Sequence, residues 1–281
     1  PYVCDTTRCL DLIFKFMDRF PFYDCLRVPR KTSGQGVEEY FLIELQRVAE
    51  NLQKFTGSEI TDDRLREAIK KYNRVRALLQ RTRKEMAETR GGVDASAYLS
   101  AVRAAMVLPP EKSGVMLGEF NDNLAGYTSE SSGRAGVVMA GKMDEPEGLV
   151  DLLQESGLGI MEDHLAVGGR WVEGKADESG DPWEALVKRQ RQKLPFSGIW
   201  DDRKSRARHI IERAKELSAD GAVFLVQKFC EPAEIDLPGI REEVEKEGIP
   251  FLAVETDFRQ GALEQVRTRV EAFSEMLRER K

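Results

Sequence analysis

Two cysteines in this sequence are predicted to stand at the carboxyl ends of β-strands, where a thiol can bind a metal or act as a nucleophile. Cys230 follows the apolar run of residues 221–226, and Cys4 follows Tyr2 and Val3 at the start of the chain. In an open parallel sheet, ligands bind outside the carboxyl ends of the strands. A buried cysteine that packs as a small apolar side chain is the simpler interpretation of each position.

The two thiols would converge if their strands belonged to two α/β domains that face one cleft. Converging thiolates suit a soft metal ion or an iron–sulfur cluster. The cysteine spacing is not diagnostic, because the sequence contains no CxxC pair. A metal site shared by Cys4 and Cys230 is therefore a hypothesis that stands beside simple packing.

A third segment, residues 160–170, also contains residue types that could bind a ligand or take part in catalysis. It again follows an apolar strand. Two acidic residues and His164 are followed there by a glycine pair and Arg170. Glycines allow close backbone approach to a ligand, and an arginine can pair with a phosphate or a carboxylate. An ordinary exit from strand to loop explains the same residues without a ligand. His209, the other histidine, is predicted to lie on a helix surface.

Motifs for other kinds of chemistry are missing from the sequence. It contains no GxSxG elbow, and His164 has no nucleophile nearby. GxGxxG and GxxxxGK[ST] are also absent, so the usual phosphate cradles are not predicted. The net charge of −6 argues against a nucleic-acid partner, because binding phosphates requires a basic face.

Length and composition indicate a soluble protein with one large or two ordinary domains, since it has 281 residues of which 33% are charged. No apolar run reaches the roughly 18 residues of a membrane-spanning helix. The chain starts at Pro1 without a signal peptide, and we expect further sequence upstream. Its four cysteines are expected to stay reduced, in the cytoplasm.

Residues 1–110 predict the remnant of an N-terminal α/β unit followed by a helical section. Strands are predicted to end at Cys4 and to cover residues 22–28, with a helix between them. A helical pattern then runs from residue 37 to about residue 107. The charged side chains of its longest helix, residues 62–90, are predicted to form a solvated surface.

Residues 111–281 predict a C-terminal α/β domain, because strands alternate there with helices. This alternation implies a parallel sheet with helices on both faces. The predicted strands cover residues 137–140, 158–161, 222–226 and 250–254, and the predicted helices cover residues 111–124, 146–155, 181–190, 203–217, 238–247 and 261–277.

Several segments also match one known family, and they are spread over nearly the whole chain. They include Val3-Cys4-Asp5 and Gly168-Gly169-Arg170. The most specific are Lys228-Phe229-Cys230-Glu231-Pro232, Gly248-Ile249-Pro250 with Glu255-Thr256-Asp257, and residues 265–273. On these segments the chain resembles a subunit of the 2-hydroxyacyl-CoA dehydratase / benzoyl-CoA reductase family.

The resemblance implies an α/β fold of two flavodoxin-like parallel-sheet units with an intervening helical section. It also implies a [4Fe–4S] cluster held between the domains by three cysteines, and a homologous partner subunit. An ATP-dependent activator protein would inject one electron, which the cluster would pass to the thioester carbonyl of an acyl-CoA substrate. The ketyl radical would then lead to dehydration or to ring reduction, with the cofactor carrying the hard chemistry.

Matched to the family pattern, the chain lacks one cluster ligand. Cys4 and Cys230 match two ligand positions, while Ala166 stands where the third cysteine is expected. His164 lies close by and is a candidate replacement, since imidazole can ligate iron in such clusters and raises their potential.

The predicted function is that of a subunit of an iron–sulfur-dependent acyl-CoA dehydratase or aryl-CoA reductase, in the cytoplasm of an anaerobe. The missing ligand leaves an alternative, a non-catalytic supporting or electron-transfer subunit of such a complex. A cofactor-free α/β binding module is a third alternative. Cys9 and Cys25 are predicted to be packing residues.

Overall fold

The computed structural model describes residues 4–17, 19–29, 31, 34–129, 133–143, 147–193, 203–257 and 262–280. The chain divides into two compact units. The helical unit comprises Pro1–Asn73 and Gly174–Lys193, and the α/β unit comprises Arg74–Glu173 and Asp202–Lys281. Within the described residues, no helix has both the length and the apolar character needed to cross a bilayer.

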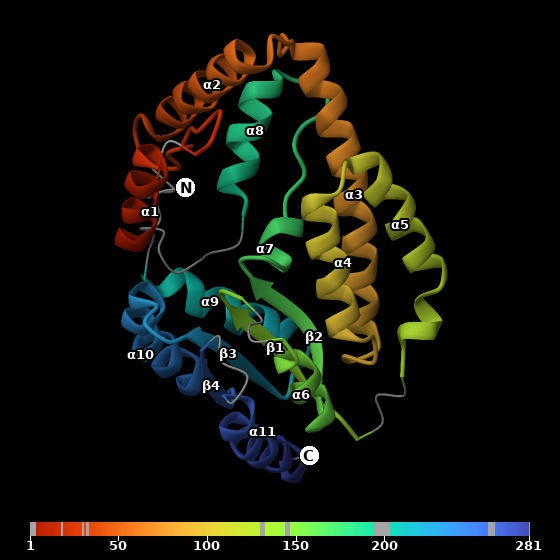
Figure 1. Cartoon of the computed structure of the whole chain (residues 1–281). Helices are drawn as coiled ribbons and strands as arrows, with labels where there is room; N and C mark the ends of the chain where they lie inside the picture. The colour runs from red at the N-terminus through yellow and green to blue at the C-terminus, as the bar shows by residue number, and fades with distance from the viewer. Residues whose placement is uncertain are drawn as a thin grey trace. The chain divides into compact units, whose positions relative to one another are not determined.

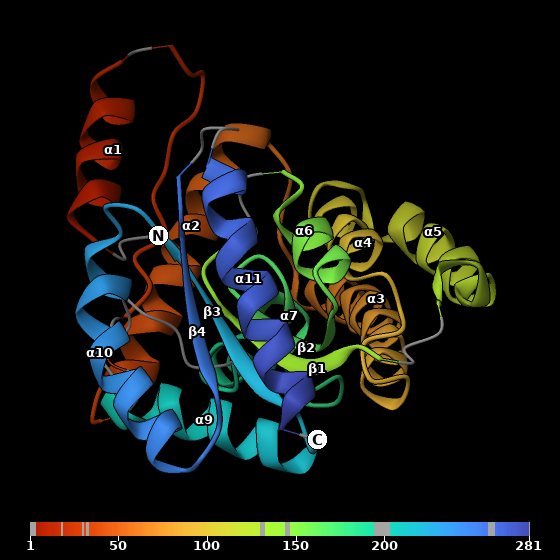
Figure 2. The same ribbon diagram turned by 90° about the horizontal axis from the view of Figure 1, so that it is seen from below.

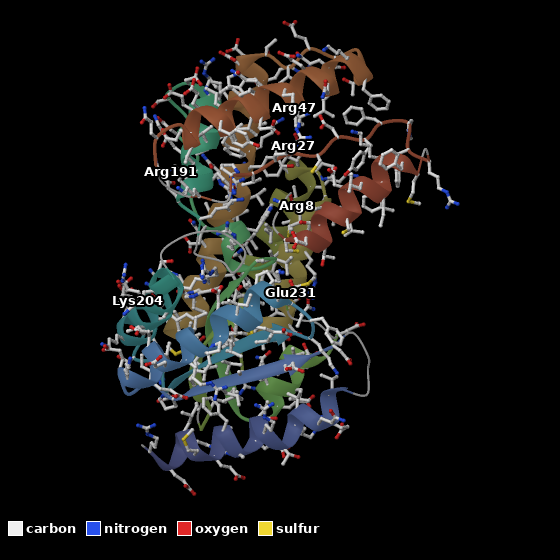
Figure 3. All side chains as sticks on the ribbon, turned by 90° about the vertical axis from the view of Figure 1, so that its left-hand side faces the viewer. Arg8, Arg27, Arg47, Arg191, Lys204 and Glu231 are labelled. Carbon is white, nitrogen blue, oxygen red and sulfur yellow. The ribbon has the colours of Figure 1, made fainter. Side chains whose placement is uncertain are left out.

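The helical unit is built from α1 (Asp5–Phe16), α2 (Val37–Thr56), the first part of α3 (Asp62–Glu88) and α8 (Pro182–Arg191), as Figure 1 shows. Helices α2 and α8 are in contact, and an ion pair joins Arg191 of α8 to Glu38 of α2 (Figure 3). Its small core consists of Ile69, Ala176 and Ala185, with Leu186 against it.

The strand predicted at residues 22–28 does not form. This segment runs alongside α2 without strand pairing, and side chains of α2 satisfy its polar groups. Arg47 donates to the Asp24 carboxylate at 2.7 Å and to the Cys25 carbonyl at 2.8 Å, and Asn51 donates to Asp24 at 2.8 Å. The strand predicted to end at Cys4 lies on residues 1–3, outside the described residues. The described residues of this unit therefore do not confirm a first flavodoxin-like unit.

The α/β unit contains a four-stranded sheet, which confirms the α/β class with a parallel sheet. Its strands are β1 (Ala135–Gly141), β2 (Leu158–Leu165), β3 (Gly221–Gln227) and β4 (Phe251–Thr256). They pair in the order β2-β1-β3-β4, and every pairing is parallel. This is the order of the first four strands in flavodoxin-like sheets, where the strand order reverses between β1 and β3.

Helices cover both faces of this sheet (Figure 2). The larger core lies on the face covered by α4 (Ala95–Val107), α6 (Leu149–Glu155), α11 (Ala262–Glu279) and the second part of α3. A smaller core lies on the face covered by α9 (Arg203–Glu216) and α10 (Glu231–Lys246). The remaining elements are α5 (Pro110–Asp122), the 3-10 helix η1 (Leu124–Tyr127) and the single turn α7 (Gly169–Val172).

Two boundaries differ from the sequence prediction near the functional segments. Strand β2 continues to Leu165, because the polar residues after Met161 find buried partners on neighbouring helices. Helix α10 starts at Glu231, although the sequence predicts a start at Pro238. Pro232 occupies the first turn of α10, where a missing N–H costs nothing, and Pro238 is accommodated inside the helix.

Candidate functional site at the carboxyl edge of the sheet

Cys230 lies three residues beyond β3 and is the N-cap residue of α10. The turn before it is closed by a hydrogen bond from the Cys230 N–H to the Gln227 carbonyl at 3.0 Å. Phe229 in this turn has a left-handed backbone, with φ of 66°. The sequence prediction that Cys230 stands at the carboxyl end of a strand is therefore confirmed.

A lysine from the neighbouring strand reaches the Cys230 sulfur. Lys142 directly follows β1, and its Nζ lies 3.0 Å from Cys230 Sγ. The carbonyl of Lys142 accepts a hydrogen bond of 3.0 Å from the N–H of Ala166, the first residue after β2. The exits of three adjacent strands thus meet here, at the edge where parallel sheets bind ligands.

Cys4 belongs to the helical unit, where it is the N-cap residue of α1. Its N–H donates to Thr7 Oγ1 at 3.1 Å. The prediction that Cys9 packs inside the protein is wrong, because Cys9 is exposed on α1. Cys25 is partly buried, and burial together with the nearby Asp11 carboxylate raises the pKa of its thiol.

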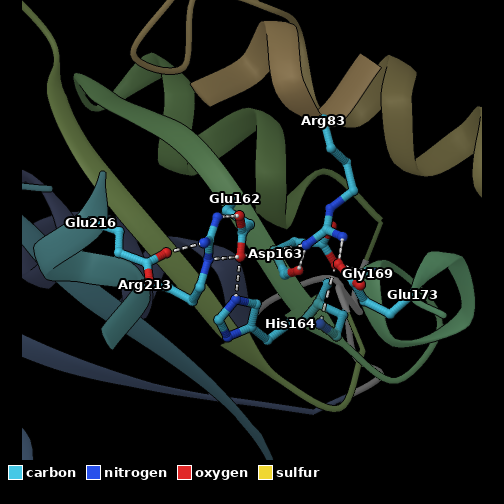
Figure 4. A network of polar contacts seen from close by, with 9 residues as sticks. Arg83, Glu162, Asp163, His164, Gly169, Glu173, Arg213 and Glu216 are labelled. Carbon is cyan, nitrogen blue, oxygen red and sulfur yellow. Dashed lines mark hydrogen bonds and ion pairs between the residues drawn. The ribbon is translucent and has the colours of Figure 1, made fainter. Parts of the chain in front are cut away.

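The segment predicted as a third ligand loop carries a buried charge network, shown in Figure 4, and its ligand role stays a prediction. Glu162 accepts hydrogen bonds from Arg213 Nε at 2.9 Å and Nη2 at 2.6 Å. It is bonded to His164 Nε2 at 2.7 Å, and Arg83 Nη2 lies 3.5 Å away. Burial acts to raise the pKa of Glu162, but the bonds to His164 and Arg213 outweigh it and hold that pKa below its ordinary value.

The Asp163 side chain lies on the other side of β2 and holds the backbone at Gly168 and Gly169 in place. One of its oxygens accepts hydrogen bonds from the N–H groups of Leu165 at 3.1 Å and Gly169 at 2.6 Å. A Cβ at Gly169 would lie 2.1 Å from the Asp163 carbonyl oxygen, so only glycine fits there. Arg83 donates to that carbonyl at 3.1 Å and pairs with Glu173. The glycine pair thus serves close packing of α7 on β2.

The two histidines lie against each other, with ring centroids 4.5 Å apart. The prediction of a surface position for His209 is wrong, because α9 turns this ring toward β2. Burial, reinforced by the neighbouring His164, lowers the pKa of His209 to about 4. His164 is 6% exposed and lies within β2, one residue before the strand ends. Its role as a metal ligand stays a prediction.

Arg83, Arg213 and Lys142 are residues of this edge that the sequence pattern did not single out. The expectation that the charges of residues 62–90 form a solvated surface is wrong for Arg83, which is 7% exposed. Nothing in the local sequence distinguishes Arg83 or Arg213 from the exposed arginines on the same helices, because their shared buried partner, Glu162, is distant along the chain.

The surroundings of Cys230 fit a metal-binding thiolate, but the described residues do not complete a ligand set. The Cys230 thiol lies at the N-terminus of α10, and the Lys142 ammonium group lies 3.0 Å from its sulfur. Within those residues, no group of three or more His, Cys, Asp or Glu side chains is arranged to hold a metal ion. Ala166, at the position predicted for the third thiol, offers only a methyl group.

Comparisons with known proteins extend over nearly the whole chain. The family model for "2-hydroxyglutaryl-CoA dehydratase, D-component" matches residues 1–277. The beta subunit of (R)-phenyllactyl-CoA dehydratase from Clostridium sporogenes is 27% identical, over 98% of this chain and 73% of the relative. The beta subunit of lactoyl-CoA dehydratase from Anaerotignum propionicum is also 27% identical, with the same coverage.

A second branch of relatives carries a different activity in its name. One subunit of the benzoyl-CoA reductase from Thauera aromatica is 23% identical, over 99% of this chain and 73% of the relative. The dehydratase and reductase names agree with the resemblance that the sequence segments carry. With a family model matched over residues 1–277, the chain belongs to the 2-hydroxyglutaryl-CoA dehydratase D-component family, which includes subunits of 2-hydroxyacyl-CoA dehydratases and benzoyl-CoA reductase.

Proposed function

We propose that this chain is one subunit of a 2-hydroxyacyl-CoA dehydratase or of an aryl-CoA reductase of the benzoyl-CoA type. The match of the family model over residues 1–277 is the observation that supports this most strongly. Because the relatives are named as single subunits of larger enzymes, the proposal includes a homologous partner subunit. It also includes an acyl-CoA substrate, an ATP-dependent activator protein that delivers single electrons, and a location in the cytoplasm of an anaerobe.

The cofactor we propose is a [4Fe–4S] cluster with Cys4 and Cys230 among its ligands. When bound, such a cluster supplies single electrons, which is what reduction of a thioester carbonyl to a ketyl radical requires. The contribution of this chain is to present thiolates. Each of the two cysteines is the N-cap residue of a helix.

The presence of Ala166 where a third cysteine is expected favours a second candidate function. In this alternative, the chain supports a catalytic partner subunit or passes electrons to it. A methyl group cannot ligate iron, and the Nε2 atom of His164 is already bonded to Glu162 at 2.7 Å. A cluster bound here through only two thiols would leave coordination positions to groups from elsewhere. In that case the partner subunit would hold the complete ligand set and bind the substrate.

Anaerobic purification of the chain together with its partner subunit tests these alternatives. We expect iron and sulfide analysis to give a cluster for each subunit if this chain takes part in electron transfer or catalysis. One cluster per pair of subunits would favour the supporting role. A complex without iron in any anaerobic preparation would overturn the proposed function.

The change Ala166→Cys tests where the missing ligand belongs. We expect this variant to retain more iron than the wild type after anaerobic reconstitution, because a third thiolate would join the two proposed ligands. Ala272→Cys is a matched control, since it adds an exposed thiol on α11 next to Phe273, which lies against Gly221 at the opposite, amino end of β3. Equal iron retention in both variants would contradict the placement of the third ligand at position 166.

A further inference from the structure

We propose that Lys142 and Cys230 form a covalent modification site, at which dioxygen links the lysine nitrogen to the cysteine sulfur through one oxygen atom. The observation that carries this proposal is the distance of 3.0 Å between Lys142 Nζ and Cys230 Sγ. At this distance the two atoms are in contact but not bonded, and a single oxygen atom nearly spans the gap. The proposal concerns the chain with no metal on Cys230, so it goes beyond the proposed function and does not depend on it.

The backbone on the lysine side is anchored to both neighbouring strands. Gly141, the last residue of β1, has a φ of 135° and pairs with Leu225 of β3. A Cβ at Gly141 would lie 2.3 Å from the Leu225 carbonyl oxygen, so this close approach requires glycine. On the other side, the N–H of Ala166 donates to the Lys142 carbonyl at 3.0 Å. The amine is therefore presented to the sulfur from a fixed position.

The turn that carries the sulfur is fixed as well. The Cys230 N–H donates to the Gln227 carbonyl at 3.0 Å. Phe229 has a φ of 66°, and its N–H donates to Glu234 Oε1 at 3.0 Å, which ties the turn to α10. Groups held in contact in this way react far faster than the same groups free in solution.

Lys142, and not the lysine nearest to Cys230 in the sequence, is the amine in contact with the sulfur. Lys228 is only two residues from Cys230, but its Nζ lies over the Phe229 ring, 5.4 Å from the ring centroid. Cys230 and Lys142 are both partly buried rather than sealed from solvent. A small oxidant can therefore reach the pair.

The reaction balances with dioxygen as the oxidant. The S–H bond of Cys230, one N–H bond of Lys142 and the O–O bond break. One oxygen atom forms new bonds to sulfur and nitrogen, and the other leaves as water with the two hydrogen atoms. Sulfur and nitrogen each lose two electrons, and dioxygen gains four. Two molecules of a dithiol reverse the step, because their four hydrogen atoms regenerate the thiol and the amine and release one water.

A partner that traps the sulfur decides what becomes of an oxidised thiol. Without one, oxidation continues to sulfinic and sulfonic acids, which are not returned to the thiol by ordinary reductants. The bridge to Lys142 instead keeps Cys230 in a form that a dithiol can recover. While the bridge is present, the sulfur cannot bind a metal.

The test is peptide mass spectrometry of the full chain, purified anaerobically, freed of metal with a chelator and then divided between air and anaerobic buffer. After trypsin digestion of the air sample, we expect residues 135–170 linked to residues 229–241, with one oxygen atom gained and two hydrogen atoms lost. The first of these peptides stays uncleaved at Lys142, because the bridge blocks trypsin there. The anaerobic sample, and an air sample treated with a dithiol, should both lack this product.

Two lysine variants identify the nitrogen. Lys142→Arg keeps the positive charge and the trypsin site but removes the primary amine, so the linked product should be lost. Lys228→Arg is the matched control and should form the link as the wild type does. Circular dichroism checks that both variants fold, and fragment spectra of the linked wild-type peptides locate the bridge without any variant.

The outcomes for this site and for the proposed function are separate. Cys230 that stays free in air, or that is found only in another oxidised form, overturns the proposal. A direct sulfur–nitrogen bond, a link to another lysine, or a link that persists in Lys142→Arg also overturns it. None of these measurements requires iron, so a missing bridge leaves the proposed function intact, and a wild type that never binds iron leaves this site intact.

Discussion

One buried carboxylate, Glu162, contacts three cationic or protonatable side chains inside the α/β unit. It is 8% exposed and is bonded to Arg213 and His164, with Arg83 3.5 Å away. The buried guanidinium group of Arg83 and the half-buried one of Arg213 share this carboxylate. Neutralising Glu162 would therefore remove a carboxylate partner from both arginines.

Glu162→Gln is expected to lower the free energy of unfolding by about 3 kcal/mol, because the buried Arg83 and the half-buried Arg213 would each lose a carboxylate partner. Urea unfolding followed by circular dichroism measures this. The matched control is Glu216→Gln, which also removes a partner of Arg213 but from a side chain that is 61% exposed. The control should change the free energy by no more than about 0.5 kcal/mol. Equal losses in the two variants would contradict the account.

The lowered pKa of His209 makes the stability of the folded protein sensitive to acid. Its pKa is lowered to about 4 by burial and by the neighbouring His164, against an ordinary value of 6.5. Between these two pH values the unfolded chain takes up a proton that the folded chain refuses, so stability should fall as the pH decreases from 6.5 to 4. Groups that face the ring are Glu162, Arg213 and Arg83.

The variant His209→Gln should flatten that part of the pH profile, because it removes the proton uptake of the unfolded chain. Urea midpoints measured at intervals between about pH 7.5 and 5 provide the comparison, with the wild type as reference. Parallel profiles for the two proteins would show that another group titrates in this range. The partners of these buried residues could not be predicted from the sequence, since β2, α3 and α9 are brought together only by the fold.

At the scale of elements, the glycine pair after β2 determines how closely α7 approaches that strand. A Cβ at Gly168 would lie 2.1 Å from Asp163 Oδ1, and one at Gly169 would lie 2.1 Å from the Asp163 carbonyl oxygen. The sequence points to close backbone approach at these glycines, and the structure confirms it. The group approached is the protein's own Asp163, which the sequence did not reveal.

Gly169→Ala is expected to lower the free energy of unfolding by about 3 kcal/mol, because the new methyl group overlaps backbone that cannot move away. Gly118→Ala is the matched control in α5, where a Cβ meets nothing within 4 Å. That control should instead raise the free energy by about 1 kcal/mol through helix propensity. Differential scanning calorimetry on both variants would show opposite shifts in melting temperature, and shifts of the same sign would contradict this interpretation.

Elements with apolar periodicity could be predicted from the sequence, and elements sustained by distant polar partners could not. The strands predicted at residues 222–226 and 250–254 form as Gly221–Gln227 and Phe251–Thr256. The strand predicted at residues 22–28 does not form, and two of its backbone groups pair with side chains of α2 instead of a neighbouring strand. Arg47 donates to the Cys25 carbonyl, and Glu44 accepts from the Arg27 N–H. The pattern of apolar residues indicates which face of an element is buried. It does not indicate which charged side chain from a distant part of the sequence will pair with that element.

For the whole molecule, the sequence predicts a parallel α/β unit but not the order of its strands. The order β2-β1-β3-β4 places the exits of β1 and β3 side by side, and with them Lys142 and Cys230. The proximity of Lys142 and Cys230 depends on the strand order and cannot be predicted from their spacing in the sequence. Membership of the dehydratase and reductase family rests on segments from both units, including those that contain Cys4 and Cys230.

We propose that Cys4 and Cys230 are ligands of an iron–sulfur cluster, and iron content in cysteine variants tests this proposal most directly. After anaerobic reconstitution, the wild type and Cys9→Ser should bind about four iron atoms per chain, the content of a [4Fe–4S] cluster. Cys9 is exposed on α1, one helical turn from Cys4, which makes it a matched control. The account predicts that Cys230→Ser and Cys4→Ser each lose most of this iron while keeping the circular dichroism of the wild type. Full iron retention in either variant, or a wild type without iron, would contradict it.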